Sequence, residues 1–320
     1  MHAPTVLEIC AGAGGQALGL EQAGFEHSAA VEVDPNACET LRSNRPDWQV
    51  LEGDVRDSAV FRAEDHTGVD LLAGGVPCPP FSIAGKGLGA LDERDLYNYA
   101  VNLVPVIQPK GLLLENVKGL SSKRFDGYRD HVRKLLEGWG YRTSWRLLNA
   151  EGFGVPQRRP RYILVALQDE YFEYFHWPEP NDEPPSTVGE TLLDEMASEG
   201  WPFAKDWASR AQDVAPTVVG GSHKHGGADL GPTGAKRAWA LLGVDGHGIA
   251  DTPPSRSHLA DHVPRLTNEM VYQLQGWRKQ DKWVISGKKT AKYRQIGNAF
   301  PPPVAKEIGQ SIRLAVQKQG

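Results

Sequence analysis

The chain has 320 residues, 40% hydrophobic and 23% charged, as in an ordinary globular protein with room for one large domain, or for one domain carrying a smaller one. No stretch is long and apolar enough to cross a membrane, and residues 1–4 lead straight into a strand pattern, so we expect neither a signal peptide nor a membrane partner. Cys10, Cys38 and Cys78 include no close pair, which disfavours a disulfide framework or a cysteine zinc site and predicts a reducing, cytoplasmic setting.

The net charge of −5 argues, taken alone, against a nucleic-acid partner. The distribution of charge matters more than the sum, because residues 264–300 contain eight Lys or Arg and only two acidic residues. A basic stretch of this kind is compatible with binding a polyanion, and it is equally typical of a solvated face.

Strand and helix patterns alternate along the first half of the chain. Strands are predicted at 5–9, 29–33, 48–51, 69–73, 111–114, 143–148 and 162–167. Helices are predicted up to Gln22 after the first strand, from Pro35 onward, and at 96–107 and 128–136. This alternation predicts an α/β sheet with helices on both faces, in which ligands bind at the carboxyl ends of the strands.

The pattern changes after residue 169. Residues 176–262 are rich in Pro, Gly, His and Trp and show no alternation, which predicts a second, irregular domain whose tryptophans form its core. Helical patterns return at 268–274 and 304–316. We therefore expect a first domain over 1–169, an irregular domain over 170–262, and a return to the first domain over 263–320.

A glycine-rich turn follows the first predicted strand. Gly12-x-Gly14-x-x-Ala17, with Glu32 twenty residues after Gly12, satisfies the loose dinucleotide-binding fingerprint. A carboxylate at Glu32 would accept hydrogen bonds from ribose hydroxyls, and Asp54 is placed to accept from an adenine amino group. The Asp54 contact is one that a methyl-donor cofactor needs, but the glycine motif by itself fits a nicotinamide cofactor and S-adenosylmethionine about equally well.

A single cysteine stands in an unusual setting at the end of the fourth predicted strand. Two glycines and Pro77-Cys78-Pro79-Pro80 follow the apolar run, and the prolines prevent the strand from continuing. The result is a stiff turn that presents one thiol, so Cys78 is a candidate nucleophile. The alternative is a buried and inert cysteine.

Further polar residues are predicted to lie near strand and helix ends. Glu115 ends the fifth strand, Arg159 and Arg161 precede the last strand, and Gly297-Asn298-Ala299 is predicted to open the final helix. Each also has a purely structural interpretation: a helix-capping acid for Glu115, surface charges for the arginines, and an N-cap for Asn298.

In combination and in this order, these stretches resemble the DNA cytosine-5 methyltransferase family, over residues 5–167 and again over 265–316. The motifs that carry the resemblance are Pro77-Cys78-Pro79-Pro80-Phe81-Ser82, Glu115-Asn116-Val117 and Gln157-x-Arg159-x-Arg161. Two departures are Cys10, where the family usually has Phe, and Asp95, where it usually has Gly.

The resemblance implies an α/β, Rossmann-like S-adenosylmethionine-dependent sheet, with 170–262 as a smaller, irregular target-recognition domain. It implies methyl transfer to C5 of a cytosine flipped out of the duplex, by a covalent adduct between Cys78 and C6. Glu115 would donate a proton to N3, and Arg161 together with Arg159 would hold the O2 side. The methyl donor would be bound by Cys10, Ala11, Gly12, Gly14, Gly15, Glu32, Val33, Asp54, Val55, Pro77, Asn298 and Ala299.

The partners implied are double-stranded DNA and a cognate restriction endonuclease that acts on the same site without forming a stable complex. The protein would be a nucleoid-associated prokaryotic monomer of restriction-modification or orphan type. Residues 215–221 resemble the start of the recognition module, and Lys224, Lys236 and Arg237 are candidate DNA contacts. No metal is expected, since His223-x-His225 has no evident third ligand.

Three other functions compete with this interpretation. A nicotinamide-dependent oxidoreductase explains the first 60 residues but not Cys78, Glu115 and Arg161 together. An RNA cytosine-5 methyltransferase, acting on tRNA, would use the same chemistry. Its subgroup typically carries a Cys-Phe-Thr tripeptide, which this chain lacks. A catalytically silent DNA-binding regulator is disfavoured because the nucleophile and its acid are both present.

Overall fold

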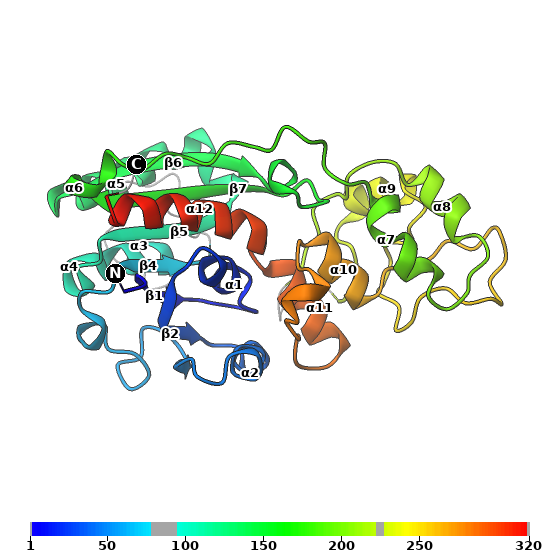
Figure 1. Ribbon diagram of the computed structural model, residues 1–320, viewed down its shortest axis with the longest axis horizontal. Coiled ribbons are helices and arrows are strands. Elements are labelled where there is room, and N and C mark those ends of the chain that lie inside the picture. The colour runs from blue at the N-terminus through cyan, green and yellow to red at the C-terminus, as the bar shows by residue number, and fades with distance from the viewer. Residues whose placement is uncertain (1, 78–94, 222–226, 319–320) are drawn as a thin grey trace. The chain divides into compact units, whose positions relative to one another are not determined.

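The computed structural model describes residues 2–77, 95–221 and 227–318 (Figure 1). The chain forms two compact units: the first comprises Met1–Leu148, Pro160–Pro178 and Val304–Gly320, and the second comprises Asn149–Arg159 and Glu179–Pro303. These bounds differ from the expected 1–169, 170–262 and 263–320. The second unit also takes in 263–303 and the short segment 149–159.

Long-range hydrogen bonds explain why residues 263–303 belong to the second unit. The Gln157 side chain donates to the Leu274 carbonyl at 3.0 Å, and the Tyr293 hydroxyl donates to the Val219 carbonyl at 3.1 Å. Both bonds join segments that are far apart in the sequence, which local sequence patterns do not reveal.

A seven-stranded sheet forms the centre of the first unit, with strand order β3-β2-β1-β4-β5-β7-β6. The strands are β1 Thr5–Ile9, β2 Glu26–Glu32, β3 Val50–Glu52, β4 Leu71–Gly74, β5 Gly111–Val117, β6 Tyr141–Asn149 and β7 Pro160–Gln168. The pairs β1–β2, β2–β3, β1–β4 and β4–β5 are parallel, whereas β7 is antiparallel to β5. All seven strands were predicted within a few residues, and the expected α/β class is confirmed.

The strand order reverses between β1 and β4. The chain builds outward from β1 to β2 and β3, then returns to the other side of β1 and builds β4 and β5. Ile9 pairs with Gly74, so these two strands end at the same level of the sheet. In an open α/β sheet a ligand-binding crevice forms at such a point, outside the carboxyl ends of the strands.

Helices cover the sheet of the first unit. They are α1 Gly15–Gln22, α2 Pro35–Asn44, α3 Leu96–Asn102, α4 Val104–Ile107, α5 Asp126–Gly138, α6 Asp169–Phe172 and α12 Pro302–Val316. Short 3-10 turns lie at Ala63–His66, Lys118–Ser121, Lys123–Phe125, Ala150–Phe153 and, in the second unit, Lys279–Asp281. The single helix predicted over 96–107 is divided into α3 and α4, and Pro105, which lacks an amide hydrogen, lies just after the break.

The α3, α4 and α5 helices bury one face of the sheet. The fully buried residues of this core include Leu7, Ile9, Leu72, Leu112 and Leu114 from the strands and Tyr97, Val101, Val104, Val132 and Leu136 from the helices. Each such side chain contributes about 1.5–3 kcal/mol by leaving water. α12 packs against α1, because a Cβ at Gly309 would lie 2.8 Å from Ala23 Cβ, and Figure 1 shows α12 passing over β5 and β7.

The second unit is helical in its regular parts. Its helices are α7 Val188–Ala197, α8 Ala204–Arg210, α9 Thr233–Leu241, α10 Asn268–Leu274 and α11 Lys289–Asn298. Among the described residues of 179–303 there are isolated bridges but no strand. The segment expected to be irregular thus holds α7, α8 and α9. The prediction that its tryptophans are core residues is confirmed for Trp201, Trp207 and Trp239, which are each at most 3% exposed, but not for Trp177, which is only partly buried. Trp277 and Trp283, farther along the second unit, are also at most 3% exposed.

Candidate active site

The turn after β1 adopts left-handed backbone conformations. Gly12 and Gly14 have φ of 55° and 79°, which glycine adopts without strain. Cys10 has φ of 52°, a conformation that is uncommon for residues other than glycine. The Ala11 amide donates to the Val31 carbonyl at 3.2 Å, and Gly15 begins α1. The predicted residues 10–15 therefore form one tight turn at the carboxyl end of β1.

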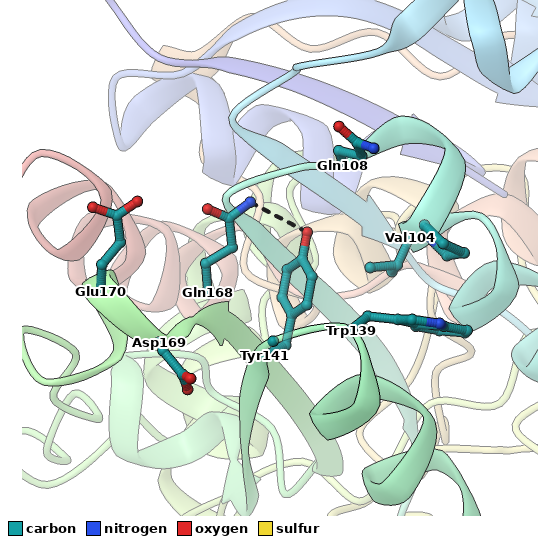
Figure 2. Close-up of a pocket in the computed structure, with 9 residues that line it drawn as sticks. Val104, Gln108, Trp139, Tyr141, Gln168, Asp169 and Glu170 are labelled. Carbon is teal, nitrogen blue, oxygen red and sulfur yellow. Dashed lines mark hydrogen bonds between the residues drawn. The ribbon is translucent and has the colours of Figure 1, made fainter.

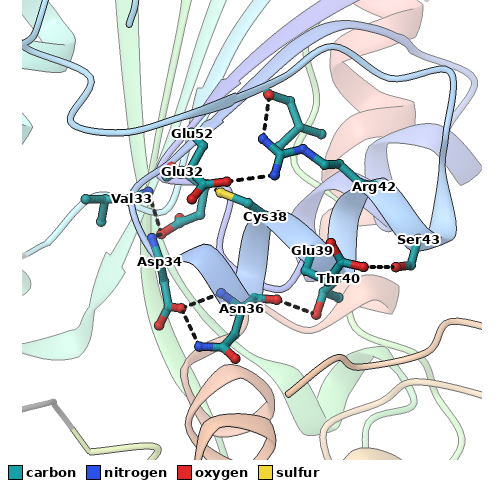
Figure 3. Close-up of polar contacts among 11 residues, drawn as sticks. Glu32, Val33, Asp34, Asn36, Cys38, Glu39, Thr40, Arg42, Ser43 and Glu52 are labelled. Carbon is teal, nitrogen blue, oxygen red and sulfur yellow. Dashed lines mark hydrogen bonds and ion pairs between the residues drawn. The ribbon is translucent and has the colours of Figure 1, made fainter.

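Glu32, the last residue of β2, is tied to this turn, because one of its carboxylate oxygens accepts from the Gly12 amide at 2.7 Å. The other oxygen accepts from the amides of Val33 and Asp34 at 2.9 and 2.8 Å, and Figure 3 shows Glu32 beside these two residues. The side chain is fixed in orientation and only 8% of Glu32 is exposed, whereas Val33 is 65% exposed. A carboxylate held this way retains lone pairs for a ligand hydroxyl.

Two cysteines lie close to Glu32. Burial raises the pKa of the Cys10 thiol to about 12, and the negative charge of Glu32 acts in the same direction. Burial likewise raises the pKa of Cys38 to about 12, and its thiol donates to the Glu32 carbonyl at 3.2 Å. Both thiols are therefore neutral at physiological pH.

Asp54 and Val55 follow the short strand β3. A hydrogen bond from the Arg56 guanidinium holds the pKa of the Asp54 carboxyl below its usual range. Val55 is buried, and its carbonyl accepts from the Tyr99 hydroxyl at 3.0 Å. Asp54 thus presents an ionised acceptor from a segment that α3 holds in place.

Glu115 and Arg161 meet on neighbouring strands. Val117 pairs with Arg161 in the β5–β7 ladder, which places Glu115 and Arg161 diagonally on one face of the sheet. Arg161 Nε lies 2.6 Å from Glu115 Oε1, and both side chains are close to nine-tenths buried. The sequence placed both residues at one sheet edge, and the structure brings them into direct contact.

The segment after β4 approaches Glu115. A Cβ built on Gly75 would lie only 3.6 Å from Glu115 Oε2, and the buried Asn116 side chain donates to the Val76 carbonyl at 3.0 Å. Pro77 follows and is exposed. Cys78 and the rest of 78–94 lie outside the described residues. The residues directly before this predicted nucleophile, Gly75 to Pro77, are described, and Asn116 holds this segment beside Glu115.

Asn116 is a positioning residue that the sequence marks only as a member of the motif Glu115-Asn116-Val117. Its side-chain oxygen accepts from the Val117 amide at 2.9 Å while its nitrogen binds Val76. An amide directly after the predicted acid is the available signal, since a side-chain amide donates through its nitrogen and accepts through its oxygen.

Arg159 has a different environment from Arg161. It is 1% exposed, and its guanidinium donates to the carbonyls of Val218, Gly297 and Ala299 at 2.8, 2.8 and 3.1 Å. All these partners belong to the second unit, as Arg159 itself does. Arg159 thus joins the segments around residues 218 and 297–299 inside the second unit by hydrogen bonds.

Asn298 and Ala299 also belong to the second unit. Asn298 ends α11 and donates to the Gly221 carbonyl at 3.2 Å, while the Ala299 carbonyl accepts from Arg159. The expectation that residues 297–299 open the last helix is wrong, because α12 begins at Pro302. Prolines 301–303 explain the shift, since proline is favoured in the first turn of a helix and disfavours a helical residue before it.

The candidate DNA-contacting residues are described in part. Lys236 Nζ lies 2.9 Å from Asp229, and Arg237 is exposed on α9. Lys224, His223 and His225 lie outside the described residues. Of the basic residues of 264–300, Arg265, Lys279 and Lys289 form ion pairs with Asp245, Glu195 and Asp251.

A cavity of about 530 Å³ in the first unit lies at the opposite sheet edge (Figure 2). Gln168 and Tyr141 line it, and they are linked by a 3.4 Å hydrogen bond. Because Leu167 pairs with Gly111, this cavity lies where β5 begins, away from Glu115. It is separate from the candidate active site.

Comparison with known proteins decides the family. A family model described as C-5 cytosine-specific DNA methylase matches residues 4–314. The chain belongs to this family. It is therefore a DNA cytosine-5 methyltransferase, and the resemblance drawn from the sequence motifs is confirmed.

Two curated relatives are similar over nearly the whole chain. The Type II methyltransferase M.NaeI of Lentzea aerocolonigenes is 60% identical, over 100% of this chain and 77% of its own length. The Type II methyltransferase M.NgoMIV of Neisseria gonorrhoeae is 50% identical, over 98% of this chain and 99% of its own.

Solved structures support the fold of this DNA methylase. The S. pombe Dnmt2 methyltransferase superposes with a TM-score of 0.63 at 18% identity, over 98% of this chain and 99% of that one. A prophage-encoded protein of E. coli gives 0.63 at 21% identity, over 97% and 98%. At this identity the likeness concerns the fold alone.

The described part of the DNA methylase contains neither a metal-binding cluster nor a membrane-spanning helix. No group of three or more His, Cys, Asp or Glu side chains in residues 2–77, 95–221 and 227–318 is arranged to hold a metal ion. None of the helices within these ranges is both long and apolar enough to span a bilayer.

Proposed function

We propose that this methyltransferase transfers the methyl group of S-adenosylmethionine to C5 of a cytosine that is flipped out of duplex DNA, within a specific sequence. The observation that carries the proposal is the ion pair between Glu115 and Arg161 beside Gly75, three residues before Cys78. An acid, a guanidinium and a thiol are the groups that activation of cytosine requires.

The proposed mechanism begins at C6 of the base. The Cys78 thiolate adds to C6 while Glu115 donates a proton to N3, and Arg161 binds the O2 side and keeps Glu115 in position. Addition turns C5 into an enamine-like nucleophile, which takes the methyl group. A base then removes the C5 proton, the C6–S bond breaks, and the proton returns from N3. Cys78 is thereby released as a thiolate, the form in which it attacked C6.

The residues of the first unit fit S-adenosylmethionine, which when bound supplies a methyl group activated by a sulfonium. Glu32 is an oriented, nearly buried acceptor suited to ribose hydroxyls, and Asp54 is an ionised acceptor suited to the adenine amino group. The turn at residues 10–15 and Pro77 line the same edge of the sheet. Val33 and Val55 are the apolar neighbours proposed to flank the nucleoside.

Asn298, Ala299 and Arg159 are proposed to act from the second unit. Their contacts support an indirect role for Arg159, which holds the backbone of residues 218 and 297–299. Asn298 is proposed to reach the methyl donor by its side chain. The second unit is proposed to read the target sequence, with Arg237 and Lys236 as phosphate or base contacts.

We further propose that the enzyme acts as a monomer in the cytoplasm, as one half of a restriction-modification pair whose endonuclease acts on the same site independently. Two relatives named Type II methyltransferases, at 60% and 50% identity, support this context and support DNA over tRNA as substrate. Because the chain belongs to the C-5 cytosine-specific DNA methylase family, the oxidoreductase alternative is excluded.

The test uses purified protein with methyl-labelled S-adenosylmethionine and unmethylated plasmid DNA, in parallel with bulk tRNA. We expect label in DNA as 5-methylcytosine, and base-resolution mapping then gives the recognition sequence. The Cys78→Ser protein is the control for contaminating activities. Label in tRNA alone would replace the proposal with the RNA alternative, and label at another cytosine atom would overturn the mechanism.

A further inference from the structure

Gln16, the second residue of α1, is a buried side-chain amide. It is 3% exposed, and among the described residues neither its amide nitrogen nor its amide oxygen has a hydrogen-bond partner. Buried side-chain amides are nearly always hydrogen-bonded, because an unpaired buried polar group costs about 1–3 kcal/mol. A group retained at such a cost points to a partner that arrives with a ligand.

The position of Gln16 indicates where that ligand binds. A Cβ built on Gly75 would lie 3.9 Å from Gln16 Oε1, 3.9 Å from the Cys10 carbonyl oxygen and 3.6 Å from Glu115 Oε2. These three oxygens thus surround the same small region, at the carboxyl ends of β1, β4 and β5. The strand order reverses between β1 and β4, and open α/β sheets bind ligands outside the strand ends at such a point.

The polar groups around this region define the chemistry of the ligand. Gln16 offers one donor and one acceptor, the Cys10 carbonyl is a further acceptor, and the amino end of α1 favours a negative charge. A zwitterionic amino-acid group matches all of them: its carboxylate accepts from Gln16 Nε2 near the helix end, and its ammonium donates to Gln16 Oε1 and the Cys10 carbonyl.

We propose that Gln16 binds the amino-acid end of S-adenosylmethionine, and so is a cofactor-binding residue that fixes the donor along its length. The inference rests on the proposed function. Glu32 and Asp54 would hold the nucleoside end, while Gln16 holds the opposite end beside Gly75 and Glu115. The methyl-bearing sulfur lies between these two ends, so fixing both sets its direction.

The test compares two ligands that differ only at the amino-acid end. S-Adenosylhomocysteine carries it, whereas 5′-methylthioadenosine lacks it, and binding of each is measured by titration calorimetry to wild type and to Gln16→Met. Methionine keeps the length of the side chain and removes both hydrogen-bonding groups. Gln49→Met is the matched control, because Gln49 is exposed on the same unit.

We expect Gln16→Met to weaken S-adenosylhomocysteine binding by about 10- to 100-fold, as for the loss of hydrogen bonds to charged groups, and to leave 5′-methylthioadenosine binding unchanged. Gln49→Met should change neither. The melting temperature of ligand-free Gln16→Met should equal or exceed that of wild type, because an unpaired buried amide has been removed.

Three results would overturn the inference. Equal weakening of both ligands would make Gln16 a structural residue, and unchanged binding of both would exclude it from the donor site. A raised KM for DNA with unchanged S-adenosylhomocysteine binding would assign its amide to the cytosine. Failure of the proposed function is distinguishable, since wild type itself would then not bind S-adenosylhomocysteine.

Discussion

The guanidinium of Arg161 and the carboxylate of Glu115 form an ion pair at 2.6 Å between antiparallel strands, close to the backbone of Gly75. Since the two side chains share one small site, we expect their contributions to catalysis to be coupled. Glu115→Gln and Arg161→Ala should each lower kcat by about 100-fold or more. In the double variant, the fold-loss of kcat should be much smaller than the product of the fold-losses of the two single variants.

The measurement is single-turnover methylation of the mapped DNA site by wild type, both single variants and the double variant. Arg158→Ala is the control, because Arg158 is half-exposed and pairs with Asp213 at the surface. Multiplicative losses would show that Glu115 and Arg161 act independently, against the proposed division of roles.

Replacement of the proposed nucleophile gives a second prediction. Cys78→Ser should lose turnover by more than about 1,000-fold, because an alcohol is almost never ionised near neutral pH, while S-adenosylhomocysteine binding stays within a few-fold of wild type. The control is Cys38→Ser, whose hydroxyl still donates to the Glu32 carbonyl. DNA containing 5-fluorocytosine should trap wild type covalently, since no proton can leave C5, and should not trap Cys78→Ser.

Thiol reactivity provides a third prediction. The raised pKa of about 12 for Cys10 and Cys38 leaves both thiols protonated at pH 8, with a thiolate fraction of about 0.01%. Iodoacetamide should therefore modify Cys78 first in the folded protein, as measured by peptide mass spectrometry over time. All three cysteines should react in urea. Modification of Cys10 or Cys38 as fast as Cys78 would contradict the prediction.

Arg159 and Arg158 offer a matched pair for a stability test. Arg159→Ala leaves the buried carbonyls of Val218 and Gly297 without their guanidinium donor, so unfolding should be easier by about 2–5 kcal/mol. Arg158→Ala removes only an exposed ion pair and should cost less than about 1 kcal/mol. Thermal and urea unfolding measure both, and equal stability of the two variants would refute the structural role of Arg159.

Glu32 supports both the β1 turn and the proposed ribose site. Glu32→Gln keeps the size of the side chain, but its amide nitrogen cannot accept from the backbone amides that bind the carboxylate. We expect a lower melting temperature and binding of S-adenosylhomocysteine weakened by about tenfold or more. Glu39→Gln, at an exposed position of α2, should have neither effect. Unchanged binding by Glu32→Gln would remove Glu32 from the donor site.

Much of the fold followed from local sequence patterns. The apolar runs and their glycine or proline ends gave the seven strands, and the alternation with helices gave the class, because both depend on neighbouring residues. The same patterns placed Gly12, Glu32, Cys78 and Glu115 at strand ends. A parallel sheet necessarily brings such ends to one edge.

The roles of two arginines only two positions apart were decided by tertiary structure. Arg159 and Arg161 are chemically identical and share one motif, yet one binds carbonyls 59, 138 and 140 residues away, while the other reaches Glu115 across β5–β7. The unit boundary near residue 303 and the burial of the Gln16 amide, which has no partner in the described part of the chain, likewise depend on long-range packing. Sequence alone determined which chemical groups the protein carries and at which strand ends they stand. Their partners were decided by contacts between distant segments, which no local pattern encodes.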